Sequence, residues 1–467
     1  MRRKKGRLSL RIWITIILFI FMSSIIGNVE SMLLGLYLNN TTFKSGSMGA
    51  SITLFDTINL IVSLSAVVSL ITTFIIGTLS EKLKNRKIFI STGYILWGLV
   101  MVAFSFVRGG NIGRYFGYTE MSDIITTTAL LIVGFALILA FLRSATCDAA
   151  FNSWLTDVST TRASAKIEII FTLMGFVSTA VITTLVAKAQ MEQMEYNEVF
   201  VFLGVMAICI GALGFILITN PERSQQELEA NAKTSYWADL FYGFKPKAVK
   251  ENTNLYLILS SGCLFNCAYQ VFFPYLFIYI SSVILPANKE VNLASAKSII
   301  PILLSIAFVA ILVPKLMKAY PKNKSLSFIT SVLCLIVGLL ILSSTKSIIG
   351  IIIGLAPGLV GYIIIMIQFG ATVRDNIPKD KVGLFQGIRM TFLFFIPCVL
   401  GPTLGNIATK NSNITYITNG AEKLLPTEDM FLYAAIIATL IFIPMLAFLK
   451  KDKEKRLKKQ MYNKKRN

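Results

Sequence analysis

The sequence predicts an all-α membrane protein in which twelve transmembrane helices form two pseudo-symmetric six-helix bundles, with both termini in the cytoplasm. Three observations predict this class. The 467 residues are 55% hydrophobic and only 15% charged, and their mean hydropathy of +0.68 exceeds that of ordinary soluble domains. Twelve apolar stretches are long enough to cross a bilayer. The Lys and Arg residues concentrate in alternate gaps between these stretches.

Each apolar stretch is expected to be a helix, because hydrocarbon offers no hydrogen-bond partners and the backbone groups must pair within their own segment. About 20 residues that each rise about 1.5 Å cross the roughly 30 Å hydrocarbon core. In chain order, the stretches are residues 12–38, 52–79, 88–107, 125–154, 167–187, 199–219, 255–282, 298–314, 326–344, 348–373, 383–407 and 430–449.

The basic residues predict how these helices are oriented. The gaps on the side of both termini hold 34 of the 45 Lys and Arg residues, whereas the gaps on the other side hold 9. By the positive-inside rule, the side with 34 is cytoplasmic. This topology, together with attraction to anionic lipid, explains the net charge of +21 without a nucleic-acid partner.

A polar segment predicts the domain organisation. Residues 220–254 interrupt the apolar rhythm and are expected to be a cytoplasmic linker. They separate an N-terminal bundle, residues 1–219, from a C-terminal bundle, residues 255–449, and a basic cytoplasmic tail, residues 450–467, follows.

Two weak sequence similarities relate the two halves of the chain. The segments LSEKLKNRK at 79–87 and LMKAYPKNK at 316–324 each lie between the second and third helix of a half. In addition, Asp157 and Asp375 each precede another polar side chain by eleven residues, across the loop between the fourth and fifth helices. Duplicated halves of this kind are typical of transporters whose halves move about a site near the membrane midplane.

The composition excludes several function classes. The chain contains no histidine, which excludes Ser-His and Cys-His catalysis and histidine-bound metals. It also lacks a GxxxxGK[ST] loop, so ATP is not the expected energy source. Cys263 and Cys267 share a helix face, and core packing is a better interpretation of them than a metal site. We therefore expect no enzyme activity, cofactor or metal, and any proton coupling must use a carboxylate.

The segment GTLSEKLKNRK, from Gly77 to Lys87, resembles the signature loop between helices 2 and 3 of the major facilitator superfamily. A glycine is followed by an acid, Glu81, and by basic residues, Lys82 and Arg86. Glu81 stands in place of the usual Asp, and Lys82 in place of the usual Arg. The spacing of the basic residues looks more like that of the glycoside-pentoside-hexuronide cation symporters and their sucrose-transporter relatives.

This resemblance implies the major facilitator fold and a secondary transporter that works by alternating access, with helices 1, 4, 7 and 10 around the central cavity. It also implies a cytoplasmic gate, because Gly77 would let helix 2 approach helix 11 closely and Glu81 would face the positive end of helix 11. Ligand binding is the alternative role for Arg389. The gating residues predicted in this way are Gly77, Glu81, Lys82, Arg86, Asp157, Arg162, Asp375 and Arg389.

Three charged residues lie deep within predicted spans: Glu30 on helix 1, and Arg143 and Asp148 on helix 4. An unpaired charge in hydrocarbon costs at least about 2.5 to 3.5 kcal/mol, so such residues are expected to face protein or water. From the rise per residue of an α-helix, Glu30 and Arg143 are expected to differ in membrane depth by roughly 9 Å. At that difference, both a direct ion pair and a contact through water or substrate are open.

The same residues are the candidates for coupling. RSATCDAA, from Arg143 to Ala150, resembles the helix 4 motif of proton-coupled members of the superfamily. We expect Glu30 and Asp148 to carry coupling and Arg143 to contact the substrate. Two alternatives stay open: a carboxylate neutralises Arg143 for stability alone, or Asp148 belongs to the gate.

Helix 7 carries the predicted solute face. Asn266, Tyr269, Gln270 and Phe273 recur at helical spacing, so amides and rings share one side. Amides hydrogen-bond hydroxyls and rings cover the apolar faces of sugars, although interhelical packing would produce the same pattern. Gln368 on helix 10 is a further candidate for substrate binding.

These observations favour a monomeric transporter in the bacterial cytoplasmic membrane. It is expected to move a small polar solute, a sugar or a glycoside, together with a proton or monovalent cation. One alternative is an exporter of organic ions or drugs. Another, from a different class, is a membrane protein without transport activity, such as a lipid scramblase or a scaffold.

Overall fold

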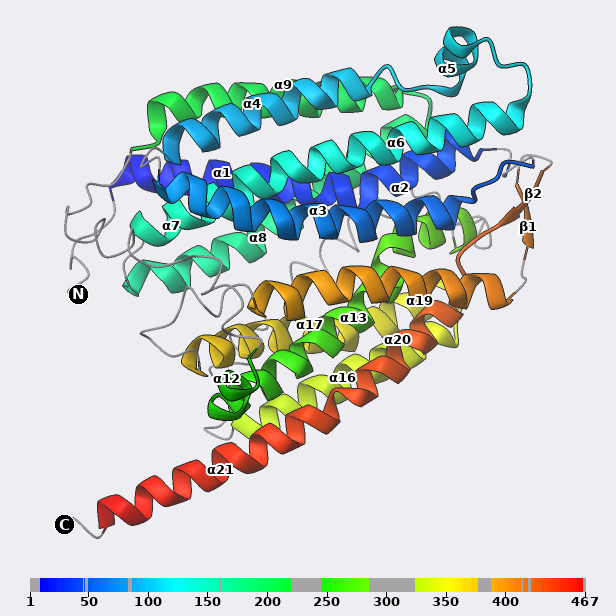
Figure 1. Ribbon diagram of the computed structural model, residues 1–467. Helices are drawn as coiled ribbons and strands as arrows, with labels where there is room; N and C mark the ends of the chain where they lie inside the picture. The colour runs from blue at the N-terminus through cyan, green and yellow to red at the C-terminus, as the bar shows by residue number, and fades with distance from the viewer. Residues whose placement is uncertain are drawn as a thin grey trace. The chain divides into compact units, whose positions relative to one another are not determined.

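The computed structural model describes residues 9–44, 46, 49–82, 86–158, 161–219, 245–284, 324–376, 388–412, 415–418 and 421–464. This part of the chain is almost entirely helical, and 11 of its helical stretches are long and apolar enough to cross a membrane (Figure 1). The predicted span at 298–314 lies outside the described residues. The chain divides into two compact units, of which the first holds the helices up to residue 217 and the second holds those from residue 246 onward.

The first unit contains six of these membrane-crossing stretches. The first and fourth are each built from consecutive α-helical and π-helical segments. The elements are α1 (Leu10–Asn28), η1 (Val29–Leu33), α2 (Leu34–Tyr37), η2 (Leu38–Thr42), α3 (Leu54–Lys82), α4 (Arg86–Phe104), α5 (Gly109–Phe116), α6 (Met121–Arg143), η3 (Ser144–Phe151), α7 (Asn152–Val158), α8 (Thr161–Gln190) and α9 (Tyr196–Leu217).

Small residues set how closely the helices of the first unit pack. Helices α4 and α9 lie side by side along most of their length (Figure 1). A Cβ atom added at Gly204 would lie only 2.7 Å from the carbonyl oxygen of Gly98, so this crossing requires glycine. Helix α1 packs on α8, and α3 packs on α6 and η3. The two α3 contacts join the second and fourth membrane stretches, and α6 also contacts η1 and η2 of the first stretch, so these three stretches surround the charged residues described below.

The second unit contains the other five membrane stretches among the described residues. Its elements are α12 (Pro246–Glu251), α13 (Thr253–Tyr279), η5 (Ile280–Ile284), α16 (Lys324–Ser343), α17 (Ile348–Asn376), η6 (Thr391–Phe395), α19 (Ile396–Ser412), α20 (Asp429–Leu440) and α21 (Phe442–Lys464).

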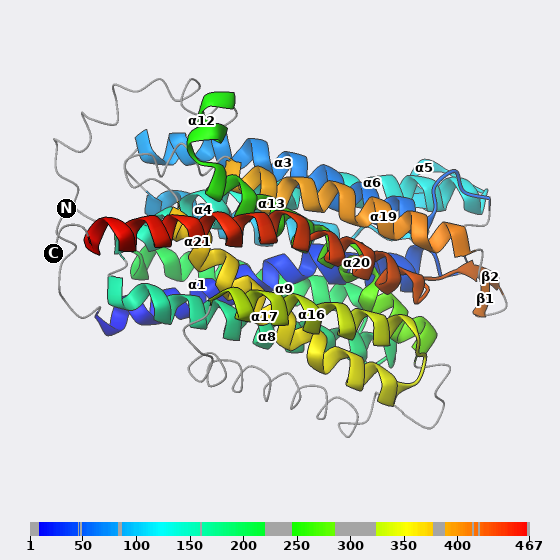
Figure 2. The ribbon, with the colours of Figure 1, turned by 90° about the horizontal axis from the view of Figure 1, so that it is seen from below.

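Helix α13 is the centre of the second unit, because it packs on α19, α20 and α21 (Figure 2). Helices α16 and α17 form the other close pair. At Gly361 an added Cβ would lie 2.6 Å from the backbone nitrogen of Leu335, so this pair also depends on a glycine. Gly354 also approaches Leu342 of α16, so two glycines of α17 face the same neighbouring helix.

Several elements differ from the sequence expectation. The short helix α5 lies between two spans, and α12 lies inside the segment expected to be linker, with Pro246 at its first turn. Helix α21 continues through much of the expected tail, to Lys464. Two strands, β1 (Thr415–Thr418) and β2 (Ala421–Leu424), pair antiparallel, so the described chain is not wholly helical. Outside hydrocarbon the backbone is free of the helical requirement, and the β-branched residues of β1 favour a strand.

Candidate functional site

The first unit brings the three buried charges into one cluster, which we call the ion cluster: Glu30, Arg143 and Asp148. Arg143 Nε donates to Glu30 Oε2 at 2.8 Å, and Arg143 Nη1 lies 3.2 Å from Asp148 Oδ2. Arg143 Nη2 also donates to Ser69 Oγ on α3, at 3.3 Å. Three membrane stretches therefore meet at a single guanidinium group.

The side chains of the ion cluster are largely buried. Their exposed fractions are 12% for Glu30, 15% for Arg143 and 22% for Asp148. With all three ionised, the cluster has one negative charge more than it has positive charges. Glu30 Oε1 is buried and has no hydrogen-bond partner in the described part of the chain. An excess charge and an unused carboxylate oxygen in one buried place are a suitable acceptor for a proton.

Side-chain direction explains why Glu30 and Arg143 meet despite their different depths. Side chains on a helix lean toward its N-terminus. The first and fourth stretches run in opposite directions, and Glu30 is expected to lie nearer the outer side than Arg143. Each side chain therefore leans toward the other, and their combined length closes the gap. The direct pair that the sequence left open is present in the structure.

A π-helical segment brings Asp148 to the same guanidinium. Asp148 follows Arg143 by five residues and lies in η3. In an α-helix, residue i+5 points well away from residue i, whereas the i to i+5 hydrogen bonds of a π-helix place the two close to one face. Ser144 Oγ, four residues before Asp148, also donates to Asp148 Oδ2 at 3.1 Å. Glu30 likewise lies in a π-helical segment, η1.

Sequence reasoning missed two polar residues that form hydrogen bonds between membrane stretches. One is Ser69, which contacts Arg143. The other is Asn28, two residues before Glu30, which donates to Ser178 Oγ at 2.8 Å and Thr179 Oγ1 at 3.1 Å on α8. Isolated hydroxyl and amide residues within apolar spans are the only signal that would have indicated them.

The second unit brings together the aromatic part of the predicted solute face. Rings from α13 and α17 form a continuous row, which we call the ring row: Phe265, Tyr362, Tyr269 and Phe273. Successive ring centroids lie 5.4, 5.0 and 4.4 Å apart, and the last pair is stacked. Helices 7 and 10 of the predicted topology thus present aromatic surface together.

The amides of the predicted face have partners within the helices. Asn266 Nδ2 donates to the carbonyl oxygen of Gly262, one turn earlier, at 2.9 Å. Gln270 Nε2 donates to Cys398 Sγ on α19, at 3.3 Å, which uses this amide between helices. Gln368 Nε2 donates to Ser327 Oγ, while Gln368 Oε1 is buried without a partner among the described residues.

The contacts of the described residues do not bring the predicted gating residues together. Glu81 and Lys82, expected in a loop, occupy the last turn of α3. Arg86 begins α4 and is buried, and Arg389 is exposed. The other predicted gating residues lie within α3, α7, α8 and α17, and their side chains are outside the described part, as are those of Glu81 and Lys82: Gly77, Asp157, Arg162 and Asp375.

The described residues include no group of three or more Cys, Asp or Glu side chains arranged to hold a metal ion. The ion cluster contains an arginine between its two carboxylates, and a fixed positive charge in that position disfavours a divalent cation. Within the described residues, the cluster is a buried arginine shared by two carboxylates.

Comparison with known proteins identifies the family. The family model for the Major Facilitator Superfamily matches residues 12–402. Among solved structures, a mutant of the nucleoside transporter NupG superposes with a TM-score of 0.63 at 14% identity, covering 95% of this chain and 99% of NupG.

A bacterial homologue of the human lysosomal transporter Spinster, in an inward-facing and unoccupied conformation, gives a TM-score of 0.59 at 12% identity, again covering 95% and 99% of the two chains. At these identities the likeness shows the fold. No curated protein matches the chain by sequence. Because the family model extends over most of the chain, the protein belongs to the Major Facilitator Superfamily and is a multi-pass membrane transporter.

Proposed function

We propose that this transporter moves a small polar solute, a sugar or a glycoside, by alternating access coupled to a proton. The observation that carries the proposal is that Glu30 and Asp148 share one buried guanidinium, that of Arg143. We also propose a monomer in a bacterial cytoplasmic membrane, with the N-terminal and C-terminal bundles at residues 1–219 and 255–449.

The ion cluster supports coupling through the direct Glu30–Arg143 pair. While Arg143 contacts Glu30, the carboxylate is stabilised in its charged form. A conformational change that separates the pair leaves Glu30 as an unpaired charge in a nonpolar environment, and binding a proton removes that cost. Glu30 Oε1, which has no partner in the described chain, is the atom to which we assign the proton. Arg143 is then free to contact the solute.

The ring row supports a solute with flat apolar faces. Sugars and glycosides have such faces, and aromatic rings stack against them while amides bind their hydroxyl groups. Gln368 Oε1 is the clearest amide group for such a bond, because it is buried and has no partner in the described chain. Asn266 and Gln270 would have to exchange their present hydrogen bonds for bonds to the solute. Nucleosides contain a sugar and a flat base, so they belong in the test panel beside sugars and glycosides.

The excess negative charge of the ion cluster favours one other function, the export of organic cations. In that case Glu30 or Asp148 would bind the cation directly. Ligand-induced thermal stabilisation separates the two proposals: sugars, glycosides or nucleosides should stabilise the protein. Stabilisation by lipophilic cations alone would replace solute uptake with drug export.

Uptake into proteoliposomes is the direct test. Radiolabelled solutes should accumulate when a pH gradient is imposed and should not accumulate without one. A sodium gradient at uniform pH is the matched control, since accumulation driven only by sodium would exclude the proton mechanism. Failure of every solute to move under either gradient would exclude sugars, glycosides and nucleosides as the transported class.

We further propose that the end of α3 is a gate, as the signature loop implies. Gly77 permits close helix approach, and Glu81 would interact with the N-terminal end of helix 11. A charged residue at position 77 should stall the transport cycle. Normal turnover by correctly inserted Gly77→Asp protein would exclude this role.

A further inference from the structure

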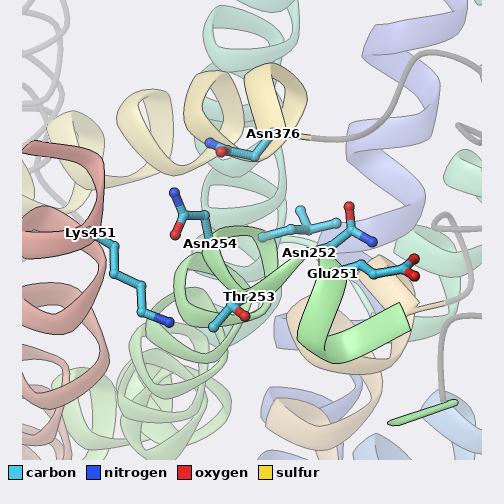
Figure 3. A pocket seen from close by; sticks show the side chains of 7 residues that line it. Glu251, Asn252, Thr253, Asn254, Asn376 and Lys451 are labelled. Atoms are coloured by element: carbon cyan, nitrogen blue, oxygen red, sulfur yellow. The ribbon is translucent and has the colours of Figure 1, made fainter. Parts of the chain in front are cut away.

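The second unit contains a polar pocket of about 290 Å³ away from the ring row (Figure 3). Four elements form it: the end of α12, the start of α13, the end of α17 and the middle of α21. The lining residues are Glu251, Asn252, Thr253, Asn254, Leu255, Asn376 and Lys451.

The lining offers both signs of charge. Figure 3 shows Lys451 and Glu251 on opposite sides of the pocket, with Asn254, Thr253 and Asn252 between them. Neither the Lys451 ammonium nor the Glu251 carboxylate has an ion-pair partner in the described part of the chain. Asn252 and Asn376 each donate to a carbonyl oxygen within their own helix, so their side-chain oxygens remain available to a ligand.

The pocket lies where the apolar spans end. The membrane stretch of α13 begins at Thr253, and the last membrane stretch ends at Lys451. Polar residues at this level lie at the depth of the lipid headgroups, because the headgroup regions extend beyond the roughly 30 Å hydrocarbon core on each side. Helix α21 continues past Lys451 with further basic residues, which attract phosphate groups to the same surface.

We propose that this pocket binds a group that carries a phosphate and a primary ammonium, as a phosphoethanolamine headgroup does. Lys451 pairs with the phosphate and Glu251 with the ammonium, while the three asparagines bond the remaining oxygen and N–H groups. A purely anionic ligand would leave Glu251 repelling it, and a purely cationic ligand would leave Lys451 unpaired. The volume is just below the range of about 300 to 1,000 Å³ for pockets that enclose drug-sized ligands, which suits a small headgroup.

Lipid binding to the purified full-length protein tests the proposal, with thermal stability and lipid retention in native mass spectrometry as readouts. Phosphatidylethanolamine should be retained in preference to phosphatidylglycerol, which lacks the ammonium, and to phosphatidylcholine, whose methylated ammonium donates no hydrogen bond. Glu251→Gln and Lys451→Gln should each weaken retention about threefold to tenfold. Lys453→Gln and Glu454→Gln, which alter exposed charges on α21 outside the pocket, are the matched controls and should retain the lipid normally.

Soluble phosphoethanolamine distinguishes the two sources of the same chemistry. If the lipid is the ligand, the soluble compound should compete only at high concentration. If the soluble compound stabilises the protein and the lipid does not, the pocket binds a cytoplasmic metabolite of this class. Equal retention of all three lipids, or variants at 251 and 451 that behave like the controls, would overturn the proposal whatever the outcome of the uptake experiments.

Discussion

The ion cluster of the first unit and the ring row of the second differ in kind, although both units are built from the same type of helix bundle. In the first, Arg143 contacts two carboxylates at 2.8 and 3.2 Å. In the second, neutral rings from α13 and α17 follow one another at 4.4 to 5.4 Å. A charge pair responds to protons and to separation, whereas stacked rings respond to the shape of a solute. Under the proposed function, the first unit carries the coupling carboxylates and the second carries the aromatic surface for the solute.

The largest effect is expected from Arg143→Ala. This change leaves two buried carboxylates without their shared partner, and breaking a buried pair costs about 3 to 5 kcal/mol of unfolding free energy. Both gradient-driven accumulation and solute exchange should be lost in proteoliposomes. Thermal unfolding of the purified variant measures the stability loss.

A double variant separates charge from packing in the ion cluster. If uncompensated charge is the cause, Glu30→Gln combined with Arg143→Ala should recover much of the stability that Arg143→Ala loses. Equal instability of the single and double variants would show that Arg143 acts by packing alone.

The second-largest effect is expected from Glu30→Gln alone. Glutamine keeps the size of the side chain and a hydrogen-bond acceptor for Arg143 but cannot exchange a proton. Accumulation driven by a pH gradient should disappear, while solute exchange across the membrane should remain, because exchange requires no net proton movement.

Glu120→Gln, at an exposed position before α6, is the control for Glu30→Gln and should behave as the unmodified protein. Accumulation by the Glu30→Gln protein with an unchanged pH dependence would move coupling to Asp148 or to sodium.

The sequence predicts some of the features on which these tests depend, and only the structure reveals the others. The helices and the three buried charges follow from hydropathy and from the cost of charge in hydrocarbon. The contact of Asp148 with Arg143 does not, because helical periodicity places a residue five positions on at a different face. The π-helical turn at 144–151 that brings them together has no distinguishing sequence pattern here.

The ring row shows a similar limit. The spacing on helix 7 predicted that Tyr269 and Phe273 share a face, and the structure confirms their stacking. It could not predict Tyr362 as the link between Phe265 and Tyr269, because that contact depends on how α17 packs against α13. Likewise, the hydrogen bond from Gln270 to Cys398 depends on the approach of α19 to α13.

A smaller and more selective effect is expected from Tyr269→Ala. Removing this ring interrupts the ring row at its centre, where aromatic pairs contribute about 0.5 to 1.5 kcal/mol each. The solute concentration for half-maximal transport should rise about tenfold, while the dependence on the pH gradient stays unchanged. Tyr269→Phe keeps the ring and is the control. Unchanged apparent affinity in Tyr269→Ala protein would remove the ring row from the solute site.

The smallest effect is expected from Asp148→Asn. This variant decides whether Glu30 alone carries the proton or shares it with Asp148. Asp148 is the more exposed carboxylate, lies farther from Arg143 than Glu30 does, and also accepts a bond from Ser144. Asparagine preserves the size and the acceptor oxygen, so stability should change by less than about 1 kcal/mol. If Glu30 alone carries the proton, accumulation should persist in this variant with a shifted pH dependence, because Arg143 then neutralises Glu30 without competition. Loss of accumulation with exchange intact, the pattern expected of Glu30→Gln, would show that the two carboxylates share the proton.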